Sequence, residues 1–104
     1  MNRNILQNAV NKGCIEWQRH ALERMMERGI SRETVKEVLL NGEIIENYHD
    51  DKPYPSALFL GWVKSQPLHV VVALDSLTGW CFVITAYKPD LEYFESDYKT
   101  RRLK

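Results

Sequence analysis

The sequence predicts an α+β domain, in which two to three N-terminal helices pack on one face of a four-stranded antiparallel meander. Up to about residue 42, apolar residues recur every three or four positions, which is typical of amphipathic helices. Beyond Gly42 they alternate with polar residues, which favours strands. The strongest pattern runs from Leu68 to Asp90, where two runs of branched and aromatic residues flank a short Asp-Ser-Leu-Thr-Gly link. We expect this stretch to form an antiparallel hairpin.

Three helices are expected before residue 42. The first covers apolar positions between residues 5 and 10 and stops at Gly13. The second covers residues 18–28 and stops at Gly29, because glycine adopts the left-handed conformation that often ends a helix. Ser31 is a suitable N-cap for the third helix, over residues 32–40. The side chains of the second helix expected to face the core are Leu22, Met25 and Met26.

Four strands are expected after the helices, over residues 43–49, residues 56–64 and the two arms of the hairpin. Residues 14–17 are only a brief β-prone link. Strict alternation gives the hairpin an apolar face, which should meet the helices. The residues assigned to that face are Leu68, Val70, Val72, Leu74, Trp80, Phe82, Ile84 and Ala86.

The other face of the hairpin carries His69, Thr85 and Tyr87 among smaller residues. A hydrophobic core needs no such groups, so we expect this face to be more open and to contain a site. The alternative is that His69 is a hydrogen-bonded structural residue of a half-buried strand.

Length and composition limit the class of protein. A chain of 104 residues with 44% apolar content fits one domain with a real core, spanning residues 1–104. Lys plus Arg equal Asp plus Glu at 14 each, which argues against a non-specific nucleic-acid coat but allows a local basic patch. The segment 91–104 ends in such a cluster, formed by Lys99, Arg101, Arg102 and Lys104.

The chain shows no apolar run long enough for a membrane span and no targeting segment, so we expect a cytoplasmic protein. Its two cysteines, Cys14 and Cys81, form neither a CxxC motif nor a disulfide framework, which favours reduced thiols. The histidines and cysteines lack metal-ligand spacing, and no phosphate-binding glycine loop is present. We therefore expect neither a metal nor a cofactor.

A stripe of polar residues follows the second predicted helix. His20, Arg24 and Arg28 recur at intervals of four, so they lie on one side of it. An imidazole beside two guanidinium groups can move a proton and hold a phosphate. The alternative is a solvated polar face laced with glutamates.

Several of these stretches occur together in a known family. The resemblance is to the bacterial family called domain of unknown function 4258, and it is carried by the series from His20 to Ser31, the run from Val35 to Gly42, the residues Leu68-His69-Val70-Val71, and the run from Ile84 to Asp90. The resemblance covers about residues 18–90. That family is similar to small RelE-like proteins, a group of metal-independent ribonuclease and toxin folds, which implies a curled antiparallel sheet beside two N-terminal helices.

The resemblance implies cleavage of RNA by its own 2′-hydroxyl, with a base, an acid and cations for the phosphorane charge. We hypothesise that His20 and His69 divide the acid and base roles and that Arg24 stabilises the transition state. Thr85 and Tyr87 would orient the substrate. The residues expected to contact RNA phosphates are Arg28, Lys88, Arg101 and Arg102.

The implied partners are RNA and a cognate antitoxin protein. The alternative is a non-catalytic module of the same fold that binds a nucleic acid or a protein, for example by β-augmentation at a strand edge.

Overall fold

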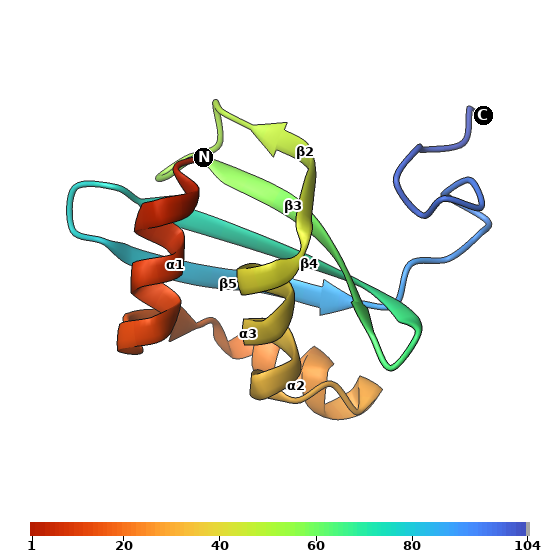
Figure 1. Cartoon of the computed structure of the whole chain (residues 1–104), viewed down its shortest axis with the longest axis horizontal. Coiled ribbons are helices and arrows are strands. Elements are labelled where there is room, and N and C mark those ends of the chain that lie inside the picture. Colours follow the sequence, from red (N-terminus) through yellow and green to blue (C-terminus); the bar gives the residue numbers. More distant parts are fainter. Residues whose placement is uncertain (104) are drawn as a thin grey trace.

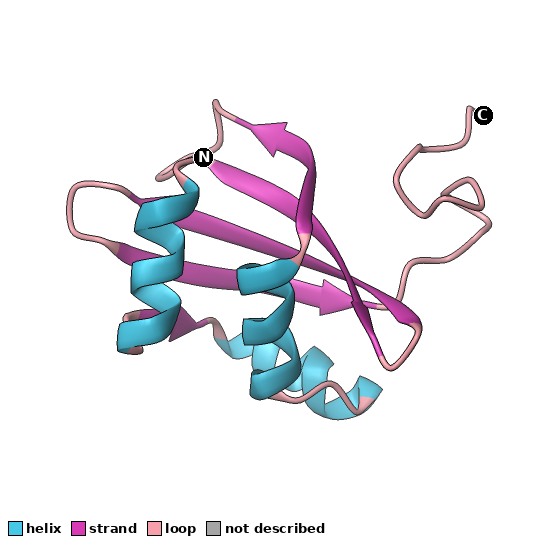
Figure 2. Ribbon diagram, in the orientation of Figure 1, coloured by secondary structure: helices cyan, strands magenta, loops and turns pink. Residues whose placement is uncertain are grey.

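The computed structural model describes residues 1–103. Within this range three helices and five strands follow one another, and the strands form one mixed sheet in the order β1-β5-β4-β3-β2. Figures 1 and 2 show α1 and α3 lying across one face of this sheet, with α2 beside β5. The elements are α1 (Arg3–Lys12), β1 (Ile15–Trp17), α2 (Arg19–Arg28), α3 (Arg32–Asn41), β2 (Glu43–Tyr48), β3 (Ser56–Val63), β4 (Gln66–Asp75) and β5 (Trp80–Tyr87).

The predicted α+β class is confirmed, but the predicted sheet is wrong in two respects. The link at residues 14–17 contributes a fifth strand, β1, which pairs in parallel with β5 so that Ile15 lies opposite Cys81. The sheet is therefore mixed, and it is neither closed nor strongly curled. A strand of three residues is too short to show the alternation that predicts strands. Its partner, β5, is also distant in the sequence, so no local pattern indicates the pairing. No helix within residues 1–103 is long and apolar enough to cross a membrane.

The predicted helix ends are confirmed. Gly13 and Gly29 end α1 and α2 in the left-handed conformation, with φ of 75° and 67°. The Ser31 hydroxyl accepts a hydrogen bond from the first turn of α3, as an N-cap does. Met26, however, is 84% exposed, whereas Met25 is buried. The buried stripe of α2 is narrow, and one residue of helix turns the side chain by about 100° away from it.

A β-bulge in β5 changes which of its side chains face the helices. Val71 and Val72 are adjacent in β4, but their partners in β5 are Thr85 and Val83, so Ile84 is an extra residue. The alternation therefore shifts by one position, and the strict pattern assigned the wrong face to Trp80, Phe82 and Ile84. The β5 side chains that join the helix-facing core are Cys81, Val83 and Ala86.

The second face of the sheet is covered, contrary to the expectation that it is open. The C-terminal segment, residues 91–103, folds back beside β2 and β4, and its turn is closed by a bridge between Phe94 and Arg101. Phe94 is only 3% exposed. Farther along the same face, the ring of Tyr54 stacks on Phe82 with centroids 5.2 Å apart. One part of this face is thus covered by the C-terminal segment, and the other by the loop between β2 and β3.

The close approach of α3 to β3 gives a test of this packing. A Cβ added at Gly61 would lie 2.6 Å from Cγ2 of Val38, whose branched side chain has few other rotamers. Gly61→Ala should therefore lower the free energy of unfolding by about 1–3 kcal/mol, measured by urea denaturation. In a Val38→Ala background the same substitution should cost much less. Equal costs in the two backgrounds would contradict this packing.

Candidate functional site

A cleft of about 530 Å³ opens where the end of β5 meets the C-terminal segment and the last residue of α2. Four side chains predicted to act in a site line it together, namely Arg28, Tyr87, Lys88 and Arg101. The other lining residues are Asp90, Tyr93 and Phe94. Sequence reasoning did not assign these three to a site. The aromatic residues that follow the Pro-Asp pair were the only available signal for them.

Arg28 reaches the cleft because the outer edge of β5 is free beyond its pairing with β1. That pairing ends at Val83, so the carbonyl of Ala86 can accept a hydrogen bond from Nη1 of Arg28, at 2.9 Å. This contact joins the last residue of α2 to β5. It also fixes the guanidinium group at the wall of the cleft.

His69 lies behind the cleft, fully buried, directly opposite Tyr87 in the register of β4 and β5. Its Nε2 is 2.7 Å from the carbonyl oxygen of Tyr98, and its Nδ1 is 3.3 Å from the Tyr87 hydroxyl. A carbonyl only accepts, so Nε2 must carry a proton. In the neutral ring Nδ1 then has a lone pair, and the Tyr87 hydroxyl donates to it. The predicted grouping of His69 with Tyr87 on one face is confirmed.

The surroundings keep both partners of this hydrogen bond neutral near pH 7. Burial lowers the pKa of His69, although the hydrogen bond to Tyr98 opposes the shift. Burial also raises the pKa of the Tyr87 hydroxyl. The ring of Phe94 packs edge-on against the imidazole with centroids 4.7 Å apart, which restricts its orientation.

Arg101 holds the C-terminal segment to β2. Its Nε and Nη2 donate to the two carboxylate oxygens of Glu46 at 2.7 and 3.0 Å. Burial by itself would raise the pKa of Glu46, but hydrogen bonds from Arg101 and Tyr48 outweigh burial and lower it. The same pair raises the pKa of Arg101. Arg101 therefore lines the cleft with its charge largely matched inside the fold.

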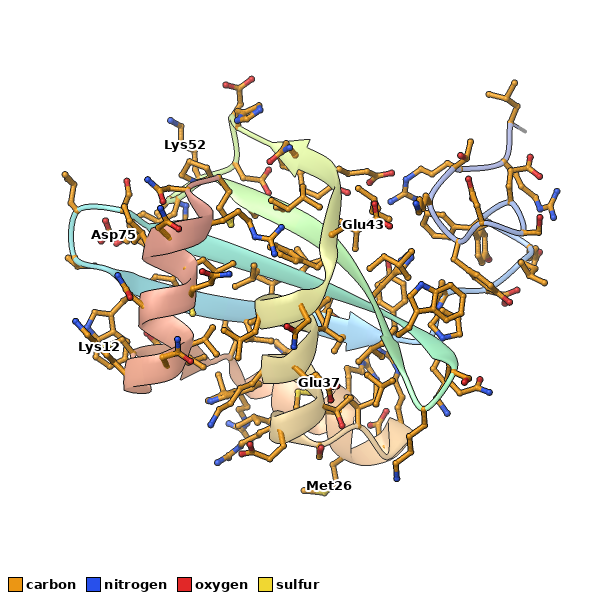
Figure 3. All side chains as sticks on the ribbon, in the orientation of Figure 1. Lys12, Met26, Glu37, Glu43, Lys52 and Asp75 are labelled. Atoms are coloured by element: carbon orange, nitrogen blue, oxygen red, sulfur yellow. The ribbon has the colours of Figure 1, made fainter. Side chains whose placement is uncertain are left out.

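The remaining basic residues of the C-terminal segment are also paired. Nζ of Lys99 is 2.8 Å from the carboxylate of Glu43, which Figure 3 shows on β2 directed toward this segment. Nη1 of Arg102 is 2.8 Å from the carboxylate of Glu95. Arg102 does not line the cleft. Arg101 and Arg102, which were expected to contact RNA phosphates, are thus both paired with carboxylates of the same chain.

His20 and Arg24 lie outside the cleft. The side chain of His20 is 91% exposed near the start of α2, 3.9 Å from Glu23, and Arg24 pairs with Glu27 at 3.3 Å. Arg28 is eight positions after His20, which places the two about 12 Å apart along the helix axis. His20 is thus in solvent while His69 is buried, and neither histidine lines the cleft. The solvated polar face is the better interpretation of this part of α2.

Thr85 shares the sheet face of His69 but does not line the cleft. It is half-buried opposite Val71 in β4. Its predicted role in orienting a substrate therefore has no support from the lining of the cleft.

The cleft is locally positive in a chain of zero formal charge. Within residues 1–103, neither Arg28 nor Lys88 forms an ion pair, and Asp90 is the one carboxylate among the lining residues. Cations beside aromatic rings suit phosphate groups and unpaired bases. In the same described range, no group of three or more His, Cys, Asp or Glu is placed to hold a metal ion.

Comparison with known proteins gives one match. Residues 17–88 match the family described as Domain of unknown function (DUF4258). The matched range contains α2 and the whole of β5, including Arg28 and Tyr87, but ends before the C-terminal segment that forms the other wall of the cleft. No curated protein and no solved structure matches the chain.

Burial of His69 gives a test through the dependence of stability on pH. Because the pKa of His69 is lowered in the folded chain, the unfolded chain takes up more protons below about pH 6.5. The free energy of unfolding should therefore fall from pH 7.5 to 5.5, by up to about 1.4 kcal/mol per pH unit from this group. Urea denaturation across this range should show a flatter dependence for His69→Gln and the parent dependence for His20→Gln. If the free energy of unfolding of His69→Gln depended on pH as steeply as that of the parent, the lowered pKa of His69 would be contradicted.

Proposed function

Because this chain belongs to the DUF4258 family, whose description names no activity, we propose a function from the cleft: metal-independent endoribonuclease activity. One observation carries the proposal. Tyr87 lines a cleft that also contains Arg28 and Lys88, and its hydroxyl is hydrogen-bonded to the neutral imidazole of His69. RNA cleavage by the 2′-hydroxyl requires a proton acceptor beside cations that bind the phosphate, and these groups meet that requirement.

The first half of the reaction uses Tyr87. The 2′-oxygen of the substrate attacks phosphorus, and its proton passes to the Tyr87 oxygen while the Tyr87 proton passes to Nδ1 of His69. The imidazolium that results keeps its Nε2 hydrogen bond to the carbonyl of Tyr98. His69 is fully buried, so it acts through Tyr87 as a positioning and proton-holding residue without contacting RNA.

The second half uses the cations of the cleft. The bond from phosphorus to the 5′-oxygen breaks, and the Lys88 ammonium gives that oxygen a proton. The products are a 2′,3′-cyclic phosphate and a 5′-hydroxyl. Arg28, fixed by the Ala86 carbonyl, stabilises the charge on the phosphorane. His20 and Arg24 have no part in these steps, because both lie outside the cleft.

The RelE-like relation and a cognate antitoxin belong to the same proposal. The resemblance noted above and the packing of helices on a sheet support the relation, while the mixed, uncurled sheet with its fifth strand differs from the RelE-like pattern. A toxin of this kind needs a partner protein that blocks its activity in the cell. The cleft, with its exposed Lys88 and Tyr93, is the surface that such a partner would cover.

One observation favours a second function, non-catalytic RNA binding by the same cleft. Burial lowers the pKa of His69, which makes its imidazole a weaker proton acceptor than an exposed one. The cations and aromatic rings would then hold RNA without cutting it. Cleavage assays separate the two functions.

Tyr87→Phe should reduce RNA cleavage by about 10²- to 10⁴-fold, because it keeps the ring but removes the hydroxyl that moves the proton. The measurement is the release of 2′,3′-cyclic phosphate ends from mixed RNA incubated in EDTA. His20→Ala is the matched control and should cleave at the parent rate. Equal rates for Tyr87→Phe and the parent would refute the role of Tyr87. Salt-sensitive binding without any product would favour the non-catalytic function.

Arg28 and Arg24 form a matched pair one turn apart on α2. Arg28→Gln should weaken RNA binding and reduce its salt dependence, because one phosphate contact is lost. Arg24→Gln should leave both unchanged, since Arg24 faces Glu27 outside the cleft. Fluorescence anisotropy across a salt series measures both effects, and circular dichroism checks that each variant is folded. The same loss in both variants would place the RNA on α2 and away from the cleft.

A further inference from the structure

A second cavity continues the cleft toward the turn between β3 and β4. Its volume is about 260 Å³, and Lys88 lines both cavities. Arg28 lines the first cavity and the next residue, Gly29, lines the second. The two cavities are therefore neighbours on either side of Lys88. We refer to the pair as the groove, which extends from the C-terminal segment to the β3–β4 turn.

Lys64 lies at the far end of this groove. It forms the turn together with Ser65, and both have left-handed φ angles, of 51° and 66°. Residues other than glycine rarely adopt this backbone conformation. The two strands therefore hold the turn in a conformation that is less favourable for Lys64 and Ser65. Lys64 is exposed and forms no ion pair with any residue between 1 and 103. Its charge is therefore available to a ligand.

The second cavity is free of opposing charge. No Asp or Glu is among its lining residues, and Lys64 and Lys88 are its charged groups. His69 pairs with Tyr87, so Lys88 follows at the level of Leu68. Gln66 pairs with Val63, the residue before Lys64, and lies two residues or roughly 7 Å along β4 from Leu68. The cations are thus spread along the groove, as in proteins that follow a phosphate backbone, and are not gathered around one anion.

We propose that the groove binds an extended single strand of RNA, with Lys64 holding a phosphate next to the one at Lys88. This inference rests on the proposed function and extends it to a substrate class. The aromatic rings of Tyr87 and Tyr93 at the first cavity favour a single strand, because bases can stack on side chains only when they are unpaired. A strand that fills both cavities gains contacts that a dinucleotide cannot reach.

The test uses fluorescein-labelled, 2′-O-methylated RNA, which cannot be cleaved by its 2′-oxygen. The probes are a hexanucleotide, a dinucleotide and a duplex of the same hexanucleotide sequence, and fluorescence anisotropy gives Kd for each. The variants are Lys64→Gln and, as the matched control, Lys52→Gln. Lys52 is an exposed lysine in the β2–β3 loop, outside both cavities of the groove, and Figure 3 shows it at the side of the molecule away from the C-terminal segment.

We expect the parent to bind the hexanucleotide more tightly than the dinucleotide or the duplex. Lys64→Gln should weaken hexanucleotide binding several-fold at low salt and reduce the slope of log Kd against log salt by about 0.7. Its affinity for the dinucleotide should not change, and Lys52→Gln should match the parent throughout.

Three results would overturn the inference. If the parent binds both single strands and Lys64→Gln changes neither, the groove does not extend to the turn, while the proposed function stands. If the duplex binds more tightly than the hexanucleotide, the substrate is not a single strand. If the parent binds no RNA, the proposed function fails and this extension fails with it.

Discussion

A fully buried imidazole with two polar nitrogens is the constraint on which the candidate site depends. Each ring nitrogen left without a hydrogen-bond partner would lower the free energy of unfolding by about 1–3 kcal/mol. The fold must therefore supply two hydrogen-bond partners. The carbonyl of Tyr98 satisfies one and the hydroxyl of Tyr87 the other. The first partner requires the C-terminal segment to fold back over β4, and that segment then forms one wall of the cleft. The second partner fixes the direction of the Tyr87 hydroxyl.

The same folding back explains how a chain without net charge presents a positive groove. Glu43, Glu46 and Glu95 are matched by the basic residues of the C-terminal segment, so these charges cancel locally. Arg28 and Lys88 have no such partners within residues 1–103. The overall balance of charges therefore conceals a surface that can bind phosphate. Of the basic cluster in the sequence, Lys99, Arg101 and Arg102 pair with carboxylates of the fold.

Local signals explain what could be predicted from the sequence. Caps such as Ser31 and the alternation that groups His69 with Tyr87 depend on neighbouring residues, and both predictions are confirmed. The pairing of β1 with β5 and the bulge at Ile84 depend on distant contacts, so alternation failed there by one residue. The role of Tyr98 could not be predicted, since a backbone carbonyl has no sequence signature. The position of His20 depends on how α2 docks, which periodicity alone does not determine.

The protonation of His69 tests the central claim most directly. Long-range ¹H–¹⁵N correlation NMR of the imidazole at pH 7 distinguishes a protonated ring nitrogen from an unprotonated one. We expect a proton on Nε2 and a lone pair on Nδ1, with the Nδ1 shift changing in Tyr87→Phe because its hydrogen-bond donor is lost. A proton on Nδ1 would mean that the Tyr87 hydroxyl accepts from His69 instead of donating to it, and would contradict the proposed path of the proton.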